Sequence, residues 1–378
     1  MKITRVSCKP LIRKVENQSA PSWLSETVIA NPMSMYPKYH ARRSSWMAPF
    51  PSMAVLIDTD EGIQGLGISY GGDSIRSIVE EHFAKLLVGE DPFDIERLWD
   101  QMNKSTLPYG RKGMSSFALS ATDSALWDTV GKALNQPVYR LLGGATKPDM
   151  PVYQTTNDRT DWQDDSFFGV KLAMPYGPSD GREGLLKNRD LVKECREKIG
   201  EKREIMLDCY MAWDVEYTFR MLDALEPYGV RWVEEVLAPD NIHGYEKLAR
   251  YSGPIAIATG EHEYLRWAHR DLLATGAISI LQPDVDWVGG ITETRRINAL
   301  ASAWGVTVCP HAGGLQAPAL HLIKSQINSP FVEWVRTWDR DKGKPEPVVI
   351  GIPDPVNGRI APSDEPGLGI RLNEDILV

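Results

Sequence analysis

The feature that most constrains the fold is a repeat that begins near residue 150, where short apolar runs alternate with longer segments of helical periodicity. The runs are rich in β-branched residues and are apolar along most of their length, which is typical of parallel strands covered on both faces. Eight strands are predicted, at 151–155, 169–173, 205–209, 230–235, 255–259, 278–282, 306–309 and 331–334. Seven or eight successive strand–helix units favour an α/β fold with a closed, TIM-like barrel.

The alternative is an open, doubly wound sheet, which needs a glycine-rich phosphate-binding turn after its first strand. No such turn follows residues 151–155. The Gly65-Leu66-Gly67 string lies within a predicted antiparallel hairpin, so it does not indicate a nucleotide site.

The first third of the chain has a different pattern. Strands are predicted at 2–8, 53–59 and 63–69, and helical spacing follows from about 75 to 140. The Ser-, Pro- and Trp-rich segment at about 15–50 is long enough to be a binding loop or lid. We therefore predict three parts, which are an α+β domain at 1–140 with a substrate loop at about 15–50, a barrel at 141–340, and a tail at 341–378 that packs back on the first domain.

The composition excludes several classes of protein. A net charge of −9 argues against a nucleic-acid-binding surface, and no Lys and Arg cluster suggests a membrane patch. The four cysteines form no CxxC pair, so neither a zinc site nor a disulfide framework is predicted. Without a signal-peptide core, or a run near the roughly 18 apolar residues of a membrane span, a cytoplasmic location is expected.

Six consecutive predicted strands each deliver an ionisable side chain to the same end of the barrel. These side chains belong to Asp208, Glu234, Glu261, Asp284, His311 and Glu333. The carboxyl ends of the strands of a parallel barrel form one face, where active sites lie. A single Asp at a strand end is often only an N-cap of the next helix, but six positions in register are not explained by six independent caps.

Three of these carboxylates, Asp208, Glu234 and Glu261, are predicted to hold a metal ion. Carboxylates that converge on one point repel each other and raise one another's pKa, and a hard divalent cation removes that conflict. Ligands that are all oxygen suit Mg²⁺.

Asp284 and His311 end adjacent strands and are predicted to form a general base. A carboxylate beside an imidazole fixes its tautomer and raises its basicity. Such a base can take the proton next to a substrate carboxylate while the metal stabilises the enediolate that forms.

Two further polar residues are candidate substrate contacts. Lys171 lies in the predicted strand at 169–173, and if the strand ends at this residue its ammonium can hold the substrate or neutralise charge. His262 directly follows Glu261, so strand alternation turns it away from the metal and favours a substrate contact or a bond to a metal ligand.

Nearly the whole chain resembles the mandelate racemase subgroup of the enolase superfamily. The resemblance rests on the string DSALWD at 123–128 and on MLDCY, WVEE, TGEHE, LQPDV and CPHAGG at successive strand ends. It implies a (β/α)₇β barrel with an α+β capping domain built from both chain ends. It also implies that Asp208, Glu234 and Glu261 bind Mg²⁺, that His311 is the base supported by Asp284, and that Glu333 hydrogen-bonds the enediolate oxygen.

Within this subgroup the chain is most similar to the L-rhamnonate dehydratases and related acid-sugar dehydratases. The strings ANPMS at 30–34, RRS at 42–44 and KLAMPYGP at 171–178 carry this similarity. It implies loss of water from an aldonic acid such as L-rhamnonate or L-lyxonate to give a 2-keto-3-deoxy acid, with Arg43 as a substrate-binding residue. It also implies a homo-oligomer.

Two other functions remain open. The racemase pattern has a second lysine two residues after the first, but Ala173 stands there, so a racemase, epimerase or cycloisomerase is the less favoured enzyme. The third hypothesis is a barrel that binds a sugar acid without catalysis.

Overall fold

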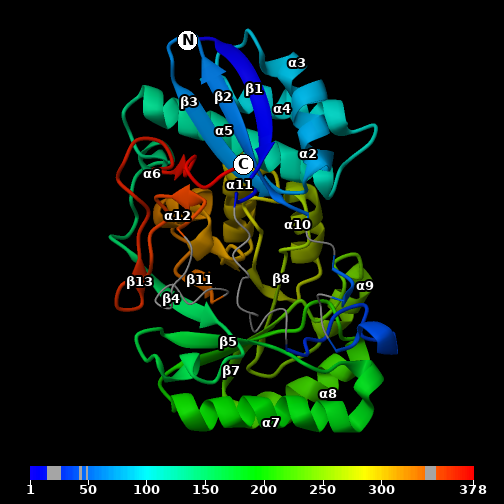
Figure 1. Ribbon diagram of the computed structural model, residues 1–378. Coiled ribbons are helices and arrows are strands. Elements are labelled where there is room, and N and C mark those ends of the chain that lie inside the picture. Colours follow the sequence, from blue (N-terminus) through cyan, green and yellow to red (C-terminus); the bar gives the residue numbers. More distant parts are fainter. Residues whose placement is uncertain (15–26, 42–44, 48–49, 337–345) are drawn as a thin grey trace.

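The computed structural model describes residues 1–14, 27–41, 45–47, 50–336 and 346–378 (Figure 1). The predicted Arg43 contact, and much of the predicted 15–50 loop, lie outside these residues. No helix of the described residues is long and apolar enough to cross a membrane.

Eight parallel strands form the barrel. They are β4 (Met150–Thr155), β5 (Gly169–Ala173), β6 (Glu204–Asp208), β7 (Val230–Glu234), β8 (Ala256–Thr259), β9 (Ile278–Leu281), β10 (Thr307–Val308) and β11 (Val332–Val335). They are ordered β10-β9-β8-β7-β6-β5-β4-β11, so β11 lies beside β4 and starts to close the sheet. All eight predicted strands and the barrel class are confirmed.

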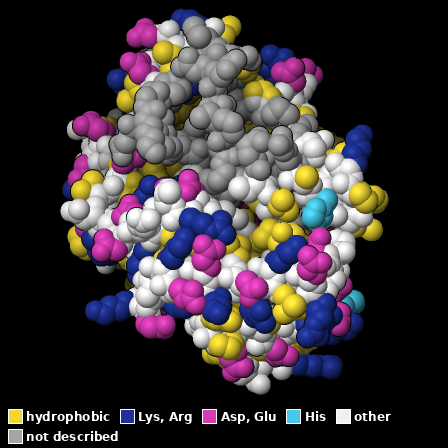
Figure 2. Space-filling model, turned by 60° about the horizontal axis from the view of Figure 1, so that its bottom comes forward, with side chains coloured by type: hydrophobic (Ala, Val, Ile, Leu, Met, Phe, Trp, Pro, Cys, Tyr) yellow, Lys and Arg dark blue, Asp and Glu magenta, His cyan; other side chains and the backbone are white. Residues whose placement is uncertain are grey.

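Helices cover the outside of the barrel. They are α7 (Gly181–Ile199), α8 (Val215–Leu225), α9 (Ile242–Leu248), α10 (Leu265–Ala274), α11 (Gly290–Ala303) and α12 (Ala317–Ser325). The β4–β5 connection is the exception, since it holds only the 3₁₀ turn Asp161–Gln163. Basic and acidic side chains are interspersed on the face that includes α7 (Figure 2), where Lys187 pairs with Glu183 and Lys198 with Glu194.

The inside of the barrel explains why polar groups gather at one end. Its apolar plug includes Tyr153, Met206, Trp232, Cys309 and Phe331. Side chains two residues apart on a strand point to the same face. Two residues beyond these five side chains stand Thr155, Asp208, Glu234, His311 and Glu333, in the same order. The strand period therefore aims this polar layer inward, directly above the plug.

The capping domain is a three-stranded antiparallel sheet packed on helices. Its strands are β1 (Ile3–Pro10), β2 (Ser52–Thr59) and β3 (Gln64–Tyr70), and its longer helices are α4 (Ile95–Thr106) and α5 (Met114–Ala133). Between β3 and α4 lie α2 (Asp73–Ser77), the π-helical turn Ile78–Phe83 and α3 (Ala84–Leu87), and α6 (Val138–Leu141) follows α5. A Cβ at Gly67 would lie 1.9 Å from the Ala121 carbonyl oxygen, so the glycines of the hairpin permit close packing of β3 on α5.

The tail runs back along both domains. β13 (Arg359–Ile360) pairs with β4, and β12 (Val349–Ile350) pairs with β14 (Arg371–Leu372). The carboxylate of Asp128 on α5 accepts hydrogen bonds from the backbone N–H of Leu66 on β3 and of Leu368 in the tail, both at 2.8 Å. One buried side chain thus joins three segments, which gives the last Asp of the 123–128 string a structural role.

The first Asp of that string joins the capping domain to the barrel. Asp123 accepts hydrogen bonds from the backbone N–H of Thr292 at 2.9 Å and from its hydroxyl at 2.6 Å, at the start of α11. Burial raises the pKa of Asp123 to about 7, although these bonds act in the opposite direction.

Candidate active site

The predicted metal ligands end neighbouring strands. Asp208 of β6 is in register with Glu234 of β7, and Glu234 is in register with Ala258 of β8. Glu261 stands three residues beyond Ala258, just after Gly260, whose φ of 131° turns the chain at the strand end. The backbone therefore brings the three carboxylate-bearing positions to one end of three adjacent strands.

Lys171 lies between two buried carboxylates. Its Nζ is 2.6 Å from Oε1 of Glu234 and 2.7 Å from Oε1 of Glu333, and all three side chains are at most 1% exposed. Burial alone lowers the pKa of Lys171, but Glu234 and Glu333 raise it well above its usual value. The lysine is therefore a buried cation that neutralises the carboxylates of β7 and β11.

Glu333 uses both of its oxygens within the protein. Oε1 accepts from the Thr155 hydroxyl at 2.5 Å as well as from Lys171, and Oε2 accepts from the backbone N–H of Ala312 at 2.8 Å. Burial raises the pKa of this carboxyl, but Lys171 and His311 lower it to about 2. Because Ala312 follows His311, Glu333 also fixes the backbone next to the predicted base.

His311 and Asp284 form the predicted pair. Nδ1 of His311 lies 2.7 Å from Oδ2 of Asp284, and Nε2 lies 3.5 Å from Oε2 of Glu261. The carboxylate of Asp284 also accepts from Nε2 of Gln316 and from the backbone N–H of Asp286, each at 2.9 Å. With Nδ1–H donating to Asp284, Nε2 is the nitrogen that faces the carboxylate cluster.

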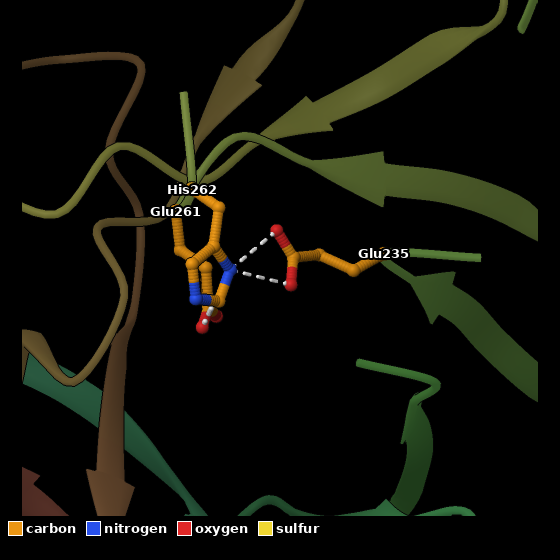
Figure 3. Close-up of side chains that lie close together, drawn as sticks. All are labelled: Glu235, Glu261 and His262. Atoms are coloured by element: carbon orange, nitrogen blue, oxygen red, sulfur yellow. Dashed lines mark hydrogen bonds and ion pairs between the residues drawn. The ribbon is translucent and has the colours of Figure 1, made fainter. Parts of the chain in front are cut away.

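His262 and Glu235 form a second pair that strand alternation does not predict. Nδ1 of His262 lies 2.9 Å and 3.0 Å from the two oxygens of Glu235, and 3.4 Å from Oε1 of Glu261 (Figure 3). Burial lowers the pKa of His262, but Glu235 and Glu261 raise it to about 9. Glu235 should point out of the barrel if β7 simply continued, but its φ of 47° breaks the alternation and sends it toward His262.

Several other non-glycine residues with positive φ follow the barrel strands. Tyr210 and Met211 come after β6, and Ala312 comes after His311, with φ values of 43°, 60° and 48°. Such conformations cost free energy of order 1–3 kcal/mol each and cluster at functional sites. Their position supports the strand ends as the site.

The donor groups suit a hard cation. Oε2 of Glu261 is buried and accepts no hydrogen bond from the described residues, and burial raises the pKa of this carboxyl. A buried carboxylate oxygen of this kind needs a partner, and a divalent cation supplies one. Among the described residues, Glu235, Glu261 and His262 have ligand atoms within 4.8 Å of one another. Glu261 belongs both to this group and to the predicted triad.

Comparison with known proteins identifies the family. A model described as mandelate racemase / muconate lactonizing enzyme, N-terminal domain, matches residues 25–143, and a model described as enolase C-terminal domain-like matches residues 161–376. The chain belongs to this enolase-like family, in the mandelate racemase group, as its strand-end motifs predict.

Particular relatives are dehydratases. An L-rhamnonate dehydratase from Saccharopolyspora erythraea is 38% identical over 365 residues, which are 95% of this chain and 93% of that protein. The structure of L-rhamnonate dehydratase from Gibberella zeae is 36% identical with a TM-score of 0.92, and covers 99% of this chain and 94% of that chain. A rhamnonate dehydratase structure from the same organism is complexed with Mg and also has a TM-score of 0.92, at 35% identity over the same shares of the two chains.

A cycloisomerase shares the fold at lower identity. The 3,6-anhydro-D-galactonate cycloisomerase from Zobellia galactanivorans is 26% identical with a TM-score of 0.79, and covers 99% of this chain and 98% of that chain. The chain is an enzyme, and the relatives with 35–38% identity are hydro-lyases.

Proposed function

We propose that the chain is a Mg²⁺-dependent dehydratase of an aldonic acid such as L-rhamnonate or L-lyxonate. The observation that carries the proposal is the His311–Asp284 pair, whose Nε2 faces Glu261 in a cluster of buried carboxylates. The named relatives support the acid-sugar class.

Asp208, Glu234 and Glu261 are the proposed metal ligands. When bound, Mg²⁺ neutralises a substrate carboxylate and stabilises the negative charge that develops when the neighbouring proton leaves. Oε2 of Glu261, which is buried and accepts no hydrogen bond from the described residues, supports this assignment. Asp208 and Glu234 support it by their register on adjacent strands.

His311 is the proposed acid and base. In the neutral ring, with Nδ1–H donated to Asp284, Nε2 has a free electron pair and takes the C2 proton of the substrate. The same nitrogen then returns that proton to the C3 hydroxyl, which leaves as water. The resulting enol gains a proton at C3, loses the proton of its C2 hydroxyl and so becomes the 2-keto-3-deoxy acid. Glu333 is proposed to support the developing enediolate and to fix the backbone at Ala312.

A racemase needs a base on each face of the substrate carbon. Lys171 is the residue at the racemase lysine position, but its ammonium is held by Glu234 and Glu333. Ala173 replaces the second lysine. His311 is therefore the one proposed acid–base group, and a single base favours elimination over racemisation.

Arg43, Lys171 and His262 are the proposed substrate-binding residues. The buried ion pairs of Lys171 with Glu234 and Glu333 support a role in which its positive charge neutralises the carboxylates beside the substrate. For His262, the 21% exposed side chain beside Glu261 supports a hydrogen bond to a substrate hydroxyl.

The test uses the purified protein with Mg²⁺ and a set of aldonic and aldaric acids, and detects 2-keto acid with semicarbazide. We expect turnover of a five- or six-carbon aldonic acid and none with His311→Asn. Exchange of deuterium at C2 without net dehydration would indicate an epimerase or cycloisomerase instead. Saturable binding with neither exchange nor dehydration would indicate a binding protein.

The proposal extends to organisation and location. We propose domain boundaries at 1–140, 141–340 and 341–378, and the hydrogen bond from Leu368 to Asp128 of α5 supports packing of the tail on the capping domain. A cytoplasmic location is supported by the four cysteines, which are all free. Similarity to the family remains the only support for a homo-oligomer.

A further inference from the structure

One tryptophan contacts the rings of both site histidines. The ring centroid of Trp287 lies 5.3 Å from that of His311 and 5.7 Å from that of His262, with interplanar angles of 42° and 45°. The two imidazoles follow different strands, β10 and β8, and Trp287 follows β9 between them. A single rigid indole therefore limits how both imidazoles can turn.

The backbone fixes this indole relative to the base pair. The N–H of Trp287 donates to the carbonyl of Asp284 at 3.1 Å, and the N–H of Asp286 donates to the carboxylate of Asp284 at 2.9 Å. The turn 284–287 thus carries both the carboxylate that bonds His311 and the ring that packs on it.

The capping domain supports the same turn from the other side. Phe117 of α5 lies 5.6 Å from the Trp287 ring, and the Ser69 hydroxyl of β3 donates to the carbonyl of Asp286 at 2.6 Å. Phe117 also contacts Tyr264 at 5.9 Å, close to His262 in the chain. The position of the indole is therefore set jointly by the barrel and the capping domain.

We propose that Trp287 is a positioning residue that holds the His311 and His262 rings in their reactive arrangement, and that its contact with Phe117 makes this arrangement depend on the docked capping domain. The hydrogen bond to Asp284 restrains His311 at one nitrogen only, so its ring can still swing about that bond. Packing against the indole removes this freedom. The role in turnover rests on the proposed function, whereas the role in ring position does not.

The first experiment compares Trp287→Phe, which keeps a flat aromatic face, with Trp287→Leu and Trp287→Met, which remove it. Misplacement of a catalytic group by about 1 Å costs roughly 100-fold in rate, so kcat of the Leu and Met variants should fall by about 10- to 100-fold. The Phe variant should stay within about threefold because the restraint on each imidazole is geometric. Trp304→Leu, at a 49% exposed tryptophan outside the site, is the matched control and should leave kcat unchanged.

A second measurement needs no substrate. The chain has seven histidines, so ¹⁵N-histidine NMR can follow the Nδ1–H of His311 that bonds Asp284, with His311→Asn to assign it. We expect a protected low-field proton in the wild type and in Trp287→Phe, and its loss in Trp287→Leu, Trp287→Met and, more weakly, Phe117→Leu. The proposal is wrong if this proton is equally protected in the Leu and Met variants, or if the Phe variant loses it as fully as they do. If no acid sugar is turned over, this measurement still decides the role of Trp287.

Discussion

Nζ of Lys171 lies 2.6 Å from Oε1 of Glu234 in a part of the barrel that is sealed from solvent. The same ammonium lies 2.7 Å from Oε1 of Glu333, so one positive charge serves two buried carboxylates. The stability of the barrel interior, where β5, β7 and β11 contribute these three side chains, therefore depends on the balance of their charges as well as on apolar packing.

Lys171→Met should destabilise the protein strongly. Removal of one partner of a buried ion pair leaves an uncompensated charge and typically costs about 3–5 kcal/mol of unfolding free energy. Urea denaturation measures the change. Lys193→Met is the control, because Lys193 pairs with Glu197 at 3.9 Å on the exposed face of α7 and should cost no more than about 1 kcal/mol. Equal losses for the two variants would contradict the structural role of Lys171.

Asp284→Asn should abolish most activity while the protein stays folded. An amide in place of the carboxylate no longer accepts the Nδ1–H of His311 with full charge, so the tautomer with a basic Nε2 is lost. General-base catalysis is worth about 10²–10⁴-fold, and we expect a fall in kcat of that order. Steady-state kinetics at saturating Mg²⁺, together with circular dichroism, give the measurement. Activity within a few fold of wild type would remove Asp284 from the mechanism.

Mg²⁺ should raise the free energy of unfolding, and substitution of a ligand carboxylate should reduce or abolish that increase. A ligand present at 100 times its Kd stabilises the folded state by about 2.7 kcal/mol, which a thermal shift detects. Glu261→Gln should abolish the shift, since Glu261 belongs to both possible groups of ligands. EDTA-treated protein provides the baseline.

The comparison of Glu234→Gln with Glu235→Gln separates the two groups. If Asp208, Glu234 and Glu261 bind the metal, the Mg²⁺ shift is lost in Glu234→Gln and kept in Glu235→Gln. The opposite result would assign the metal to Glu235, Glu261 and His262, whose ligand atoms lie within 4.8 Å of one another.

His321 should make the protein less stable in mild acid. Its Nδ1 accepts from the backbone N–H of Tyr139 at 3.1 Å, and its Nε2 lies 3.3 Å from the carbonyl of Leu368, so the neutral ring is satisfied at both nitrogens. Burial lowers the pKa of this histidine to about 4. The unfolded chain binds this proton near pH 6.5 and the folded chain does not, so stability falls as the pH drops from 6.5 to 4, by about 3 kcal/mol.

The check is urea denaturation of wild type and His321→Gln across that pH range. A glutamine amide can donate and accept as the neutral ring does but does not titrate. The difference in unfolding free energy between the two proteins should therefore shrink or reverse in favour of the variant as the pH falls. Parallel pH profiles would show that His321 titrates normally.

The strand positions and the polar layer could be predicted from sequence because both follow from one period. Buried parallel strands are apolar throughout, and a two-residue step past each plug residue leads to Asp208, Glu234, His311 and Glu333. The pairing of Asp284 with His311 could be predicted for the same reason, since each stands just past the end of an adjacent strand.

The other features of the site could not be predicted, because they depend on departures from the strand period or on contacts between residues far apart in the chain. Glu235 is aimed by a positive φ that no propensity indicates, so its bond to His262 could not be predicted. The two partners of Lys171 come from strands that are 63 and 162 positions away in the chain, and a strand-end lysine alone does not reveal them. Trp287 could be predicted only as one of several tryptophans near the strand ends.

The contacts of Asp128 have a consequence for synthesis on the ribosome. Its carboxylate accepts hydrogen bonds from the backbone N–H of Leu66, in a strand made before the barrel, and of Leu368, in the tail made after the barrel. The capping domain is therefore begun before the barrel and completed only after it. While the barrel strands are synthesised, the carboxylate lacks the Leu368 donor, and the hairpin that it supports is exposed to misfolding until the tail has been made.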